Sequence, residues 1–164
     1  MRTLKIISLA IIAVMTITVC KAQSGYRGTF EASTQFCFET EQNNAVSFGI
    51  ASVHGYQFNP YFFVGAGTEF IFGDRSLLPI FADFKANLSK SKIKPFIDFR
   101  IGAEVIDTST KGVYLNPSIG LQYALNNLLG IYVKAGYTNQ SGIKYEDGKV
   151  SNCSGITAKV GFEF

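Results

Sequence analysis

The sequence predicts an all-β fold, an eight-stranded antiparallel up-and-down barrel that spans a membrane. Three observations support this prediction. Apolar residues alternate with polar ones along eight segments, and a period of two is typical of strands with one apolar face. The apolar faces contain no Asp, Glu, Lys or Arg. Each segment has about 9 to 13 residues, which is the length that a tilted strand needs to cross a bilayer.

Residues 1–22 are expected to be a cleaved signal peptide, which leaves residues 23–164 as the barrel domain. Arg2 and Lys5 make the start basic, and the apolar stretch that follows is too short to span a bilayer as a helix. Cys20 and Ala22 suit the −3 and −1 positions of a cleavage site. Lipid attachment at Cys20 is the alternative interpretation.

The charge of the mature chain excludes some classes of partner. Cleavage removes three of the 15 basic residues, so the remaining bases equal the 12 acidic residues in number. A neutral chain gives no reason to expect a nucleic-acid partner. The mature sequence has no long apolar run typical of a transmembrane helix, and its many Phe, Tyr and Gly residues favour strands and turns. No cofactor or metal site is indicated.

Polar turns separate the first four predicted strands. The first runs from Tyr26 to Phe38 and is followed by ETEQNN. The second, from Ala45 to Phe58, ends at a tight Asn-Pro turn. The third runs from Tyr61 to Phe72. After GDRSL, the fourth carries apolar side chains at every second position from Ile80 to Leu88.

The last four predicted strands repeat the pattern. Their apolar faces extend from Ile97 to Val105, from Leu115 to Leu125, from Leu129 to Tyr137 and, in the closing ITAKVGFEF, from Ile156 to Phe164. The connection before the eighth strand contains Asp-Gly, a hairpin-turn dipeptide. We therefore expect the last two strands to continue as a ribbon, on which Tyr145 is a candidate contact for a surface partner. A plain surface loop is the alternative.

The polar faces favour a membrane barrel over a soluble one. They are rich in Gly, Ser and Thr and are balanced in charge, unlike a typical solvated surface. An even number of strands and alternating shorter and longer turns are typical of outer-membrane barrels, in which eight strands leave a lumen just wide enough for side chains. The charged residues expected in this lumen are Arg27, Glu31, Glu69, Asp83, Lys85, Asp98, Arg100, Glu104, Lys134, Lys159 and Glu163.

The signal peptide, the eight amphipathic strands, the segment HGYQFNPYFFVGAGTEF and the terminal ITAKVGFEF together resemble the small outer-membrane β-barrels of Gram-negative bacteria, of OmpX and OmpA transmembrane-domain type. The resemblance covers Gly25 to Phe164. It implies a porin-like monomer with both termini in the periplasm, in contact with outer-membrane lipid and lipopolysaccharide. In this family the barrel-assembly machinery recognises a C-terminal strand that ends in Phe, which implies that role for Phe162 and Phe164. Lys159 stands where Gly is often found.

The resemblance is specific for architecture and not for activity. Because an unpaired buried charge is costly, the acidic and basic side chains of the lumen are expected to pair with one another. Paired in this way, they would close the lumen as a plug. The alternative is an ion path or a proton relay on the carboxylates. The predicted role is therefore structural or surface-interacting and not enzymatic. The alternatives are a narrow channel for small solutes or ions and a lipid-A-modifying enzyme.

His54, the only histidine, has the parity of the lipid-facing side and lies near a predicted periplasmic turn. We expect an interfacial residue beside Tyr56 and Phe58. Some barrels of this family that modify lipid A use a His and a Ser near the outer leaflet, which makes Ser52, on the same face, the alternative partner. His54 lies near the opposite rim, so catalysis is not expected.

Cys37 and Cys153 are a candidate disulfide. If Tyr26 lies opposite Phe164 at the closing seam, Cys37 lies opposite Cys153, and both have the parity of the lumen. Exported proteins can hold disulfides, and this one would fasten the seam between the first and last strands. Two independent thiols are the alternative.

Two further sequence features have structural interpretations. Gly65 and Gly67 lack the third glycine and the following helix of a nucleotide loop, and are expected to make room in the lumen for Glu69 and Arg100. The turn SKSKIK, with lysines at 90, 92 and 94, is expected to be solvated. Contact of these lysines with inner-leaflet or peptidoglycan groups is the alternative.

Overall fold

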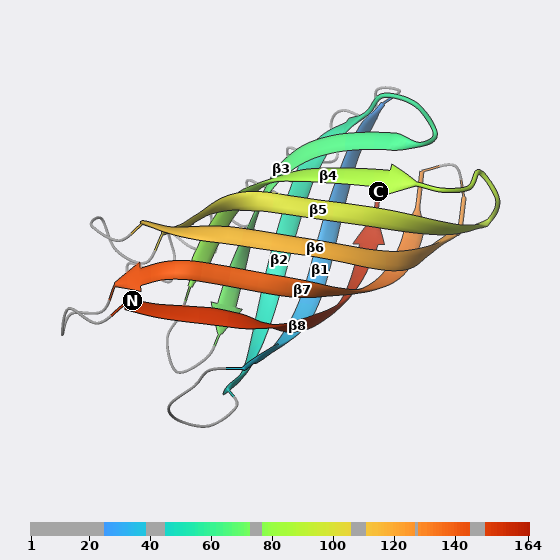
Figure 1. The fold of residues 1–164 in the computed structure, drawn as a ribbon. Coiled ribbons are helices and arrows are strands. Elements are labelled where there is room, and N and C mark those ends of the chain that lie inside the picture. Colours follow the sequence, from blue (N-terminus) through green and yellow to red (C-terminus); the bar gives the residue numbers. More distant parts are fainter. Residues whose placement is uncertain (1–24, 39–44, 73–76, 106–110, 127, 145–149) are drawn as a thin grey trace, which may run out of the picture.

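A computed structural model shows eight antiparallel strands that close into one barrel in chain order (Figure 1). The structure describes residues 25–38, 45–72, 77–105, 111–126, 128–144 and 150–164. The strands are β1 (Tyr26–Cys37), β2 (Ala45–Gln57), β3 (Phe62–Phe72), β4 (Leu78–Asn87), β5 (Ile93–Val105), β6 (Lys111–Ala124), β7 (Gly130–Lys144) and β8 (Val150–Glu163). The predicted fold class is confirmed.

The predicted strands agree with the observed ones most closely at β1 to β3. β5 and β6 begin earlier than their apolar faces indicated, and β7 and β8 pair with each other as far as Lys144 and Val150. The pairing is irregular between Gln140 and Ile143. The predicted signal peptide and Tyr145 lie outside the described residues. Within the described part of the chain, no helix is long and apolar enough to cross a membrane.

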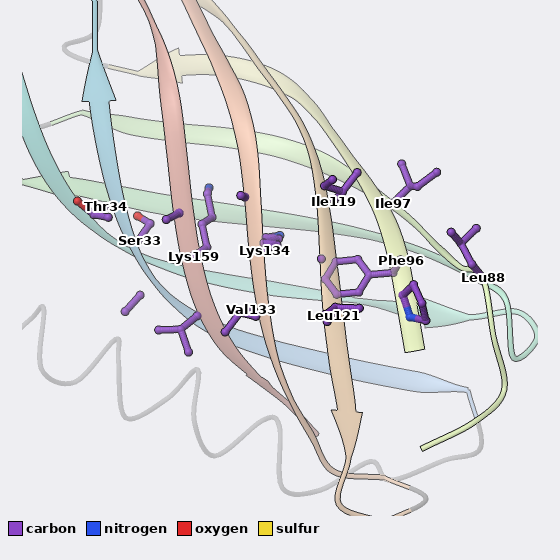
Figure 2. Close-up of a pocket in the computed structure, with 16 residues that line it drawn as sticks. Ser33, Thr34, Leu88, Phe96, Ile97, Ile119, Leu121, Val133, Lys134 and Lys159 are labelled. Atoms are coloured by element: carbon purple, nitrogen blue, oxygen red, sulfur yellow. The ribbon is translucent and has the colours of Figure 1, made fainter. Parts of the chain in front are cut away.

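The two faces of the wall differ as the alternation predicts. Figure 2 shows part of the wall, where β1 and β5 to β8 line an apolar hollow. There Ile119 is 68% exposed and Val133 is 57% exposed, whereas Lys134, the next residue, is 4% exposed. An apolar outer surface around charged interior side chains is the inverse of a soluble protein and suits a barrel surrounded by lipid.

The lumen also contains apolar side chains that the alternation pattern did not indicate. Val53, Phe63, Phe81 and Tyr114 form a buried cluster. This cluster corrects the expected role of two glycines. A Cβ atom at Gly65 would lie 2.7 Å from the ring of Phe63, and one at Gly67 would lie 2.8 Å from Val53 and 3.1 Å from Phe81. These glycines therefore make room for the apolar cluster.

The closing seam joins β1 to β8, and its predicted register is wrong by two residues. Phe164 exchanges backbone hydrogen bonds of 2.8 and 2.9 Å with Gly28 rather than with Tyr26. Thr29 lies opposite Glu163, and Cys37 lies opposite Gly155. A Cβ atom at Gly28 would lie 2.7 Å from the Phe164 ring, so the absence of a side chain at Gly28 leaves room for that ring. Because the shift is even, every side chain keeps its predicted face.

Gly155 allows β1 and β8 to approach closely. A Cβ atom there would collide with the backbone carbonyl of Phe36 and lie 2.9 Å from the Cα of Cys37. We expect Gly155→Ala to destabilise the barrel by about 1–3 kcal/mol, because backbone atoms cannot move aside as a side chain can. Urea unfolding in detergent measures the change. Gly112→Ala is the matched control, because its nearest atom is 3.1 Å away. Equal effects of the two changes would contradict this explanation.

Candidate functional site in the barrel lumen

The charged residues predicted for the lumen all lie inside the barrel, where Arg27 is half-buried and the others are buried. Arg100, on β5, is fully buried and forms the centre of the largest group. Its Nη1 and Nη2 atoms donate to the two carboxylate oxygens of Glu31 on β1, at 2.8 and 2.6 Å. This bidentate pair crosses the lumen between strands that are not neighbours in the sheet. Such fork-shaped pairs are stronger and more directional than single hydrogen bonds.

Three further residues complete the Arg100 group. Asp83 accepts a hydrogen bond from Arg100 Nε at 3.2 Å. Lys134 forms ion pairs with Glu31 at 2.9 Å and Asp98 at 2.7 Å. Arg100 and Lys134 thus hold three carboxylates, and the guanidinium also lies 4.7 Å from the centre of the Phe81 ring. The group connects β1, β4, β5 and β7, so it braces the barrel across its interior.

A second group lies beside the first. Lys159 donates to Glu69 Oε2 at 2.7 Å, and Ser33 donates to Glu69 Oε1 at 2.6 Å. Tyr114 adds a hydrogen bond of 3.1 Å to the same carboxylate. Lys159 lies directly opposite Lys134 in the β7–β8 register, yet the two amines bind different acids. The repulsion between these lysines is therefore offset by separate partners.

A third group lies near the end of the barrel where β1 begins and β8 ends. Lys85 donates to Glu163 at 2.6 Å and to Gln122 at 2.7 Å. Gln122 in turn donates to Glu163 at 2.9 Å. Each member of this trio contacts the other two, which is the condition under which a buried polar group is tolerated.

Glu104 differs from the other lumen acids. It is 1% exposed, and neither of its carboxylate oxygens has a hydrogen-bond partner in the part of the chain that the structure describes. No ion pair to it occurs within the described residues. The balance of charges in the sequence thus does not produce complete pairing. Among the described residues, no group of three or more His, Cys, Asp and Glu side chains could hold a metal ion.

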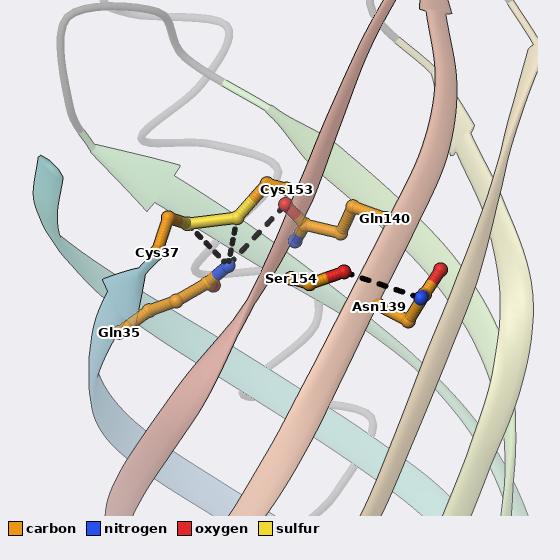
Figure 3. Close-up of a disulfide and its surroundings, with 6 residues drawn as sticks. All are labelled: Gln35, Cys37, Asn139, Gln140, Cys153 and Ser154. Atoms are coloured by element: carbon orange, nitrogen blue, oxygen red, sulfur yellow. Dashed lines mark hydrogen bonds between the residues drawn. A yellow bond between two sulfur atoms is a disulfide. The ribbon is translucent and has the colours of Figure 1, made fainter. Parts of the chain in front are cut away.

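Cys37 and Cys153 form a disulfide at the closing seam, with Cα atoms 5.6 Å apart (Figure 3). They are not directly opposite each other as predicted, because Cys37 lies opposite Gly155 and Cys153 comes two residues earlier. Gln35 Nε2 lies 3.3 Å from each sulfur and donates to Gln140 at 3.3 Å. The disulfide and its amide neighbours therefore link β1, β7 and β8.

His54 lies on the outer face and is hydrogen-bonded on both sides. Its Nε2 is 2.9 Å from Ser52 Oγ, and its Nδ1 is 2.7 Å from the hydroxyl of Tyr26. The sequence pattern indicated Ser52 but not Tyr26, which comes from the neighbouring strand. Polar groups that face lipid are costly unless they satisfy one another, and this trio does so.

The two terminal aromatic residues lie at the end of β8. Phe162 is 39% exposed on the outer face, and its ring is stacked on that of Phe164 with centroids 6.2 Å apart. This places both rings beside the seam that closes the barrel.

Comparison with known proteins is informative at the level of structure. No protein-family model matches the sequence, and no curated protein matches it. Neisserial surface protein A has a TM-score of 0.68 and 16% identity, over 85% of this chain and 96% of that one. The N-terminal β-barrel domain of Pseudomonas aeruginosa OprF has a TM-score of 0.53 and 16% identity, over 87% of this chain and all of that one.

A de novo designed transmembrane β-barrel also matches, with a TM-score of 0.56 and 12% identity, over 88% of this chain and 98% of the design. Identities this low establish the fold and not the activity. The closed ring of eight strands and these neighbours together show that the chain has the fold of the small eight-stranded outer-membrane β-barrels.

Proposed function

We propose that this chain is an integral outer-membrane protein with a structural or surface-interacting role, a lumen closed by its own side chains and no enzymatic activity. The observation that carries the proposal is the Arg100 group. Arg100 and Glu31 are 0% and 1% exposed, and their bidentate pair crosses the middle of the lumen. Side chains fixed in this way obstruct a path for solutes and brace the wall at the same time.

The proposal includes a topology and a set of contacts. Both termini lie in the periplasm, the signal peptide has been removed, and the protein is a monomer. The exposed apolar side chains of the wall contact outer-membrane lipid and lipopolysaccharide. The barrel-assembly machinery recognises the last strand through Phe162 and Phe164. Apolar outer side chains such as Ile119 and Val133 support the lipid contact.

A planar-bilayer recording separates the plug from the channel alternative. We expect a flat trace from the refolded protein, because the buried Arg100 group obstructs the lumen. A porin reconstituted in parallel is the positive control, and gel migration that changes on heating verifies that the barrel has folded. Stable single-channel steps from the folded protein would contradict the plug and favour a narrow channel.

The trio of Ser52, His54 and Tyr26 is the observation that favours the enzyme alternative, because a serine hydrogen-bonded to an oriented histidine is typical of acyl transfer. We propose that the trio only satisfies its own polar groups. Incubation with lipopolysaccharide should therefore leave the mass of lipid A unchanged. Loss or gain of an acyl chain that depends on Ser52 would overturn this assignment.

A further inference from the structure

Two exposed lysines mark the turn between β4 and β5, at the barrel end where β1 begins and β8 ends. Lys90 and Lys92 lie in this turn, and no ion pair among the described residues includes either of them. The other two turns at this end, residues 58–61 and 125–129, contain no charged residue in the sequence. The β4–β5 turn therefore concentrates positive charge at one place on the rim, which attracts anions.

Hydrogen bonds fix the shape of this turn. The backbone carbonyl of Lys92 accepts a hydrogen bond of 2.8 Å from the amide of Ala124 on β6. Ser91 Oγ donates to the carbonyl of Ile93 at 2.7 Å, so the proton in its 2.6 Å contact with Ser89 Oγ comes from Ser89. Both serine hydroxyls thus donate within the turn, and the lysine amines remain available to a ligand.

The neighbouring turn between β2 and β3 places one of these amines. Lys90 Nζ lies 4.9 Å from the centre of the Tyr61 ring, which is 40% exposed. An aromatic ring attracts a cation through its electron-rich face and carries no opposite charge of its own. Tyr61 therefore positions the Lys90 amine without neutralising it.

The two lysines stand beside side chains that face lipid. Leu88 and Ile93, which flank the turn, are 60% and 58% exposed. Leu88 also lines the apolar hollow of the wall, together with Pro95 and Ile97 (Figure 2). A ligand that matches both the charge and this apolar surface has an anionic group joined to hydrocarbon chains.

We propose that the β4–β5 turn binds the headgroup of an anionic phospholipid. The lipid phosphate lies at Lys90 and Lys92, and the acyl chains lie against Leu88 and Ile93. Lysines at a membrane surface favour anionic over neutral lipids in this way. A polysaccharide anion such as peptidoglycan would use the lysines but not the apolar flanks. The proposal rests on the membrane insertion proposed above and adds a preferred class of lipid, and its location in the periplasmic leaflet rests on the proposed topology.

The test is an NMR titration of the full refolded protein in phosphatidylcholine nanodiscs, in which phosphatidylglycerol replaces a rising share of the lipid. We expect saturable shifts of the backbone amides of Ser91 and Lys92. Lys90→Gln combined with Lys92→Gln should raise the half-saturating share of phosphatidylglycerol at least fivefold, because both charges are lost. Lys90→Arg combined with Lys92→Arg keeps the charges and should leave that share within twofold of the parent.

The matched control is Lys111→Gln combined with Lys144→Gln. These lysines begin β6 and end β7 at the opposite end of the barrel, and the change in net charge is the same. This variant should leave the half-saturating share within twofold of the parent. Equal losses in the two double glutamine variants would show a diffuse response to net charge and overturn the site, as would an unchanged response after removal of Lys90 and Lys92.

Other anions separate the lipid from alternative ligands. Inorganic phosphate or a soluble peptidoglycan fragment, added to pure phosphatidylcholine nanodiscs, should cause no saturable shift of the same amides. Saturation by phosphate would show a site for free anions, and saturation by the fragment would show a peptidoglycan site, so either result would overturn the lipid assignment. A folded spectrum in pure phosphatidylcholine verifies insertion. If the inserted barrel does not respond to phosphatidylglycerol, only this inference fails, whereas failure to insert would contradict the proposed function.

Discussion

Arg100→Met should destabilise the folded barrel by about 3–5 kcal/mol, the cost of removing one partner from a buried ion pair. Methionine can fill much of the same space, so the loss isolates the charge and its hydrogen bonds. Asp83 would lose its ion-pair partner, whereas Glu31 and Asp98 would keep Lys134. Asp83 is 3% exposed, so water cannot readily replace the guanidinium.

The measurement is reversible urea unfolding in detergent, followed by circular dichroism because the chain contains no Trp. Lys92→Met is the control for the change of net charge, since Lys92 is exposed, and it should shift the midpoint little. Adding Asp83→Asn to Arg100→Met should restore part of the loss, because the stranded charge is then gone. An unchanged midpoint in Arg100→Met would show that the lumen hydrates its charges and that the group does not brace the barrel.

The fold could be predicted because alternation reports directly on a wall with two different faces. At most positions of the strands, the residue type alone distinguishes lipid from lumen, as Val133 and Lys134 illustrate. Residue type does not place the aromatic residues of the lumen correctly, because Phe63 and Phe81 are apolar residues on the polar face. Their position depends on small neighbours, Gly65 and Gly67, and glycine placement has no period that a sequence pattern can detect.

The partners inside the lumen could not be predicted. Arg100 meets Glu31 across the barrel, and that meeting depends on how far each strand is displaced along its neighbour. Displacing one strand by two residues along its neighbour leaves every side chain on the same side of the wall. It does, however, move each side chain to a new position along the barrel axis. The same shift separates Cys37 from its predicted position opposite Cys153. The side of the wall on which a side chain lies is thus encoded by the local sequence. Its position along the barrel axis, by contrast, depends on how the strands are displaced relative to one another in the closed barrel.

The disulfide should make an equally large contribution to stability. It closes a loop with a sequence separation of 116 residues, for which the chain-entropy model gives about 5 kcal/mol. The bridge joins the first and last strands, so it confines nearly the whole barrel in the unfolded state. Cys37→Ser with Cys153→Ser should therefore lower the urea midpoint strongly.

Reductant provides the internal control for this prediction. Unfolding the parent protein in dithiothreitol should reproduce the midpoint of the double serine variant, and the variant should not respond to the reductant. Because both half-cystines are under 10% exposed, reduction should be slow in the folded barrel and fast in urea. If the parent and the variant have the same urea midpoint without reductant, the disulfide does not stabilise the seam. The backbone pairing of β1 with β8 would then close the barrel unaided.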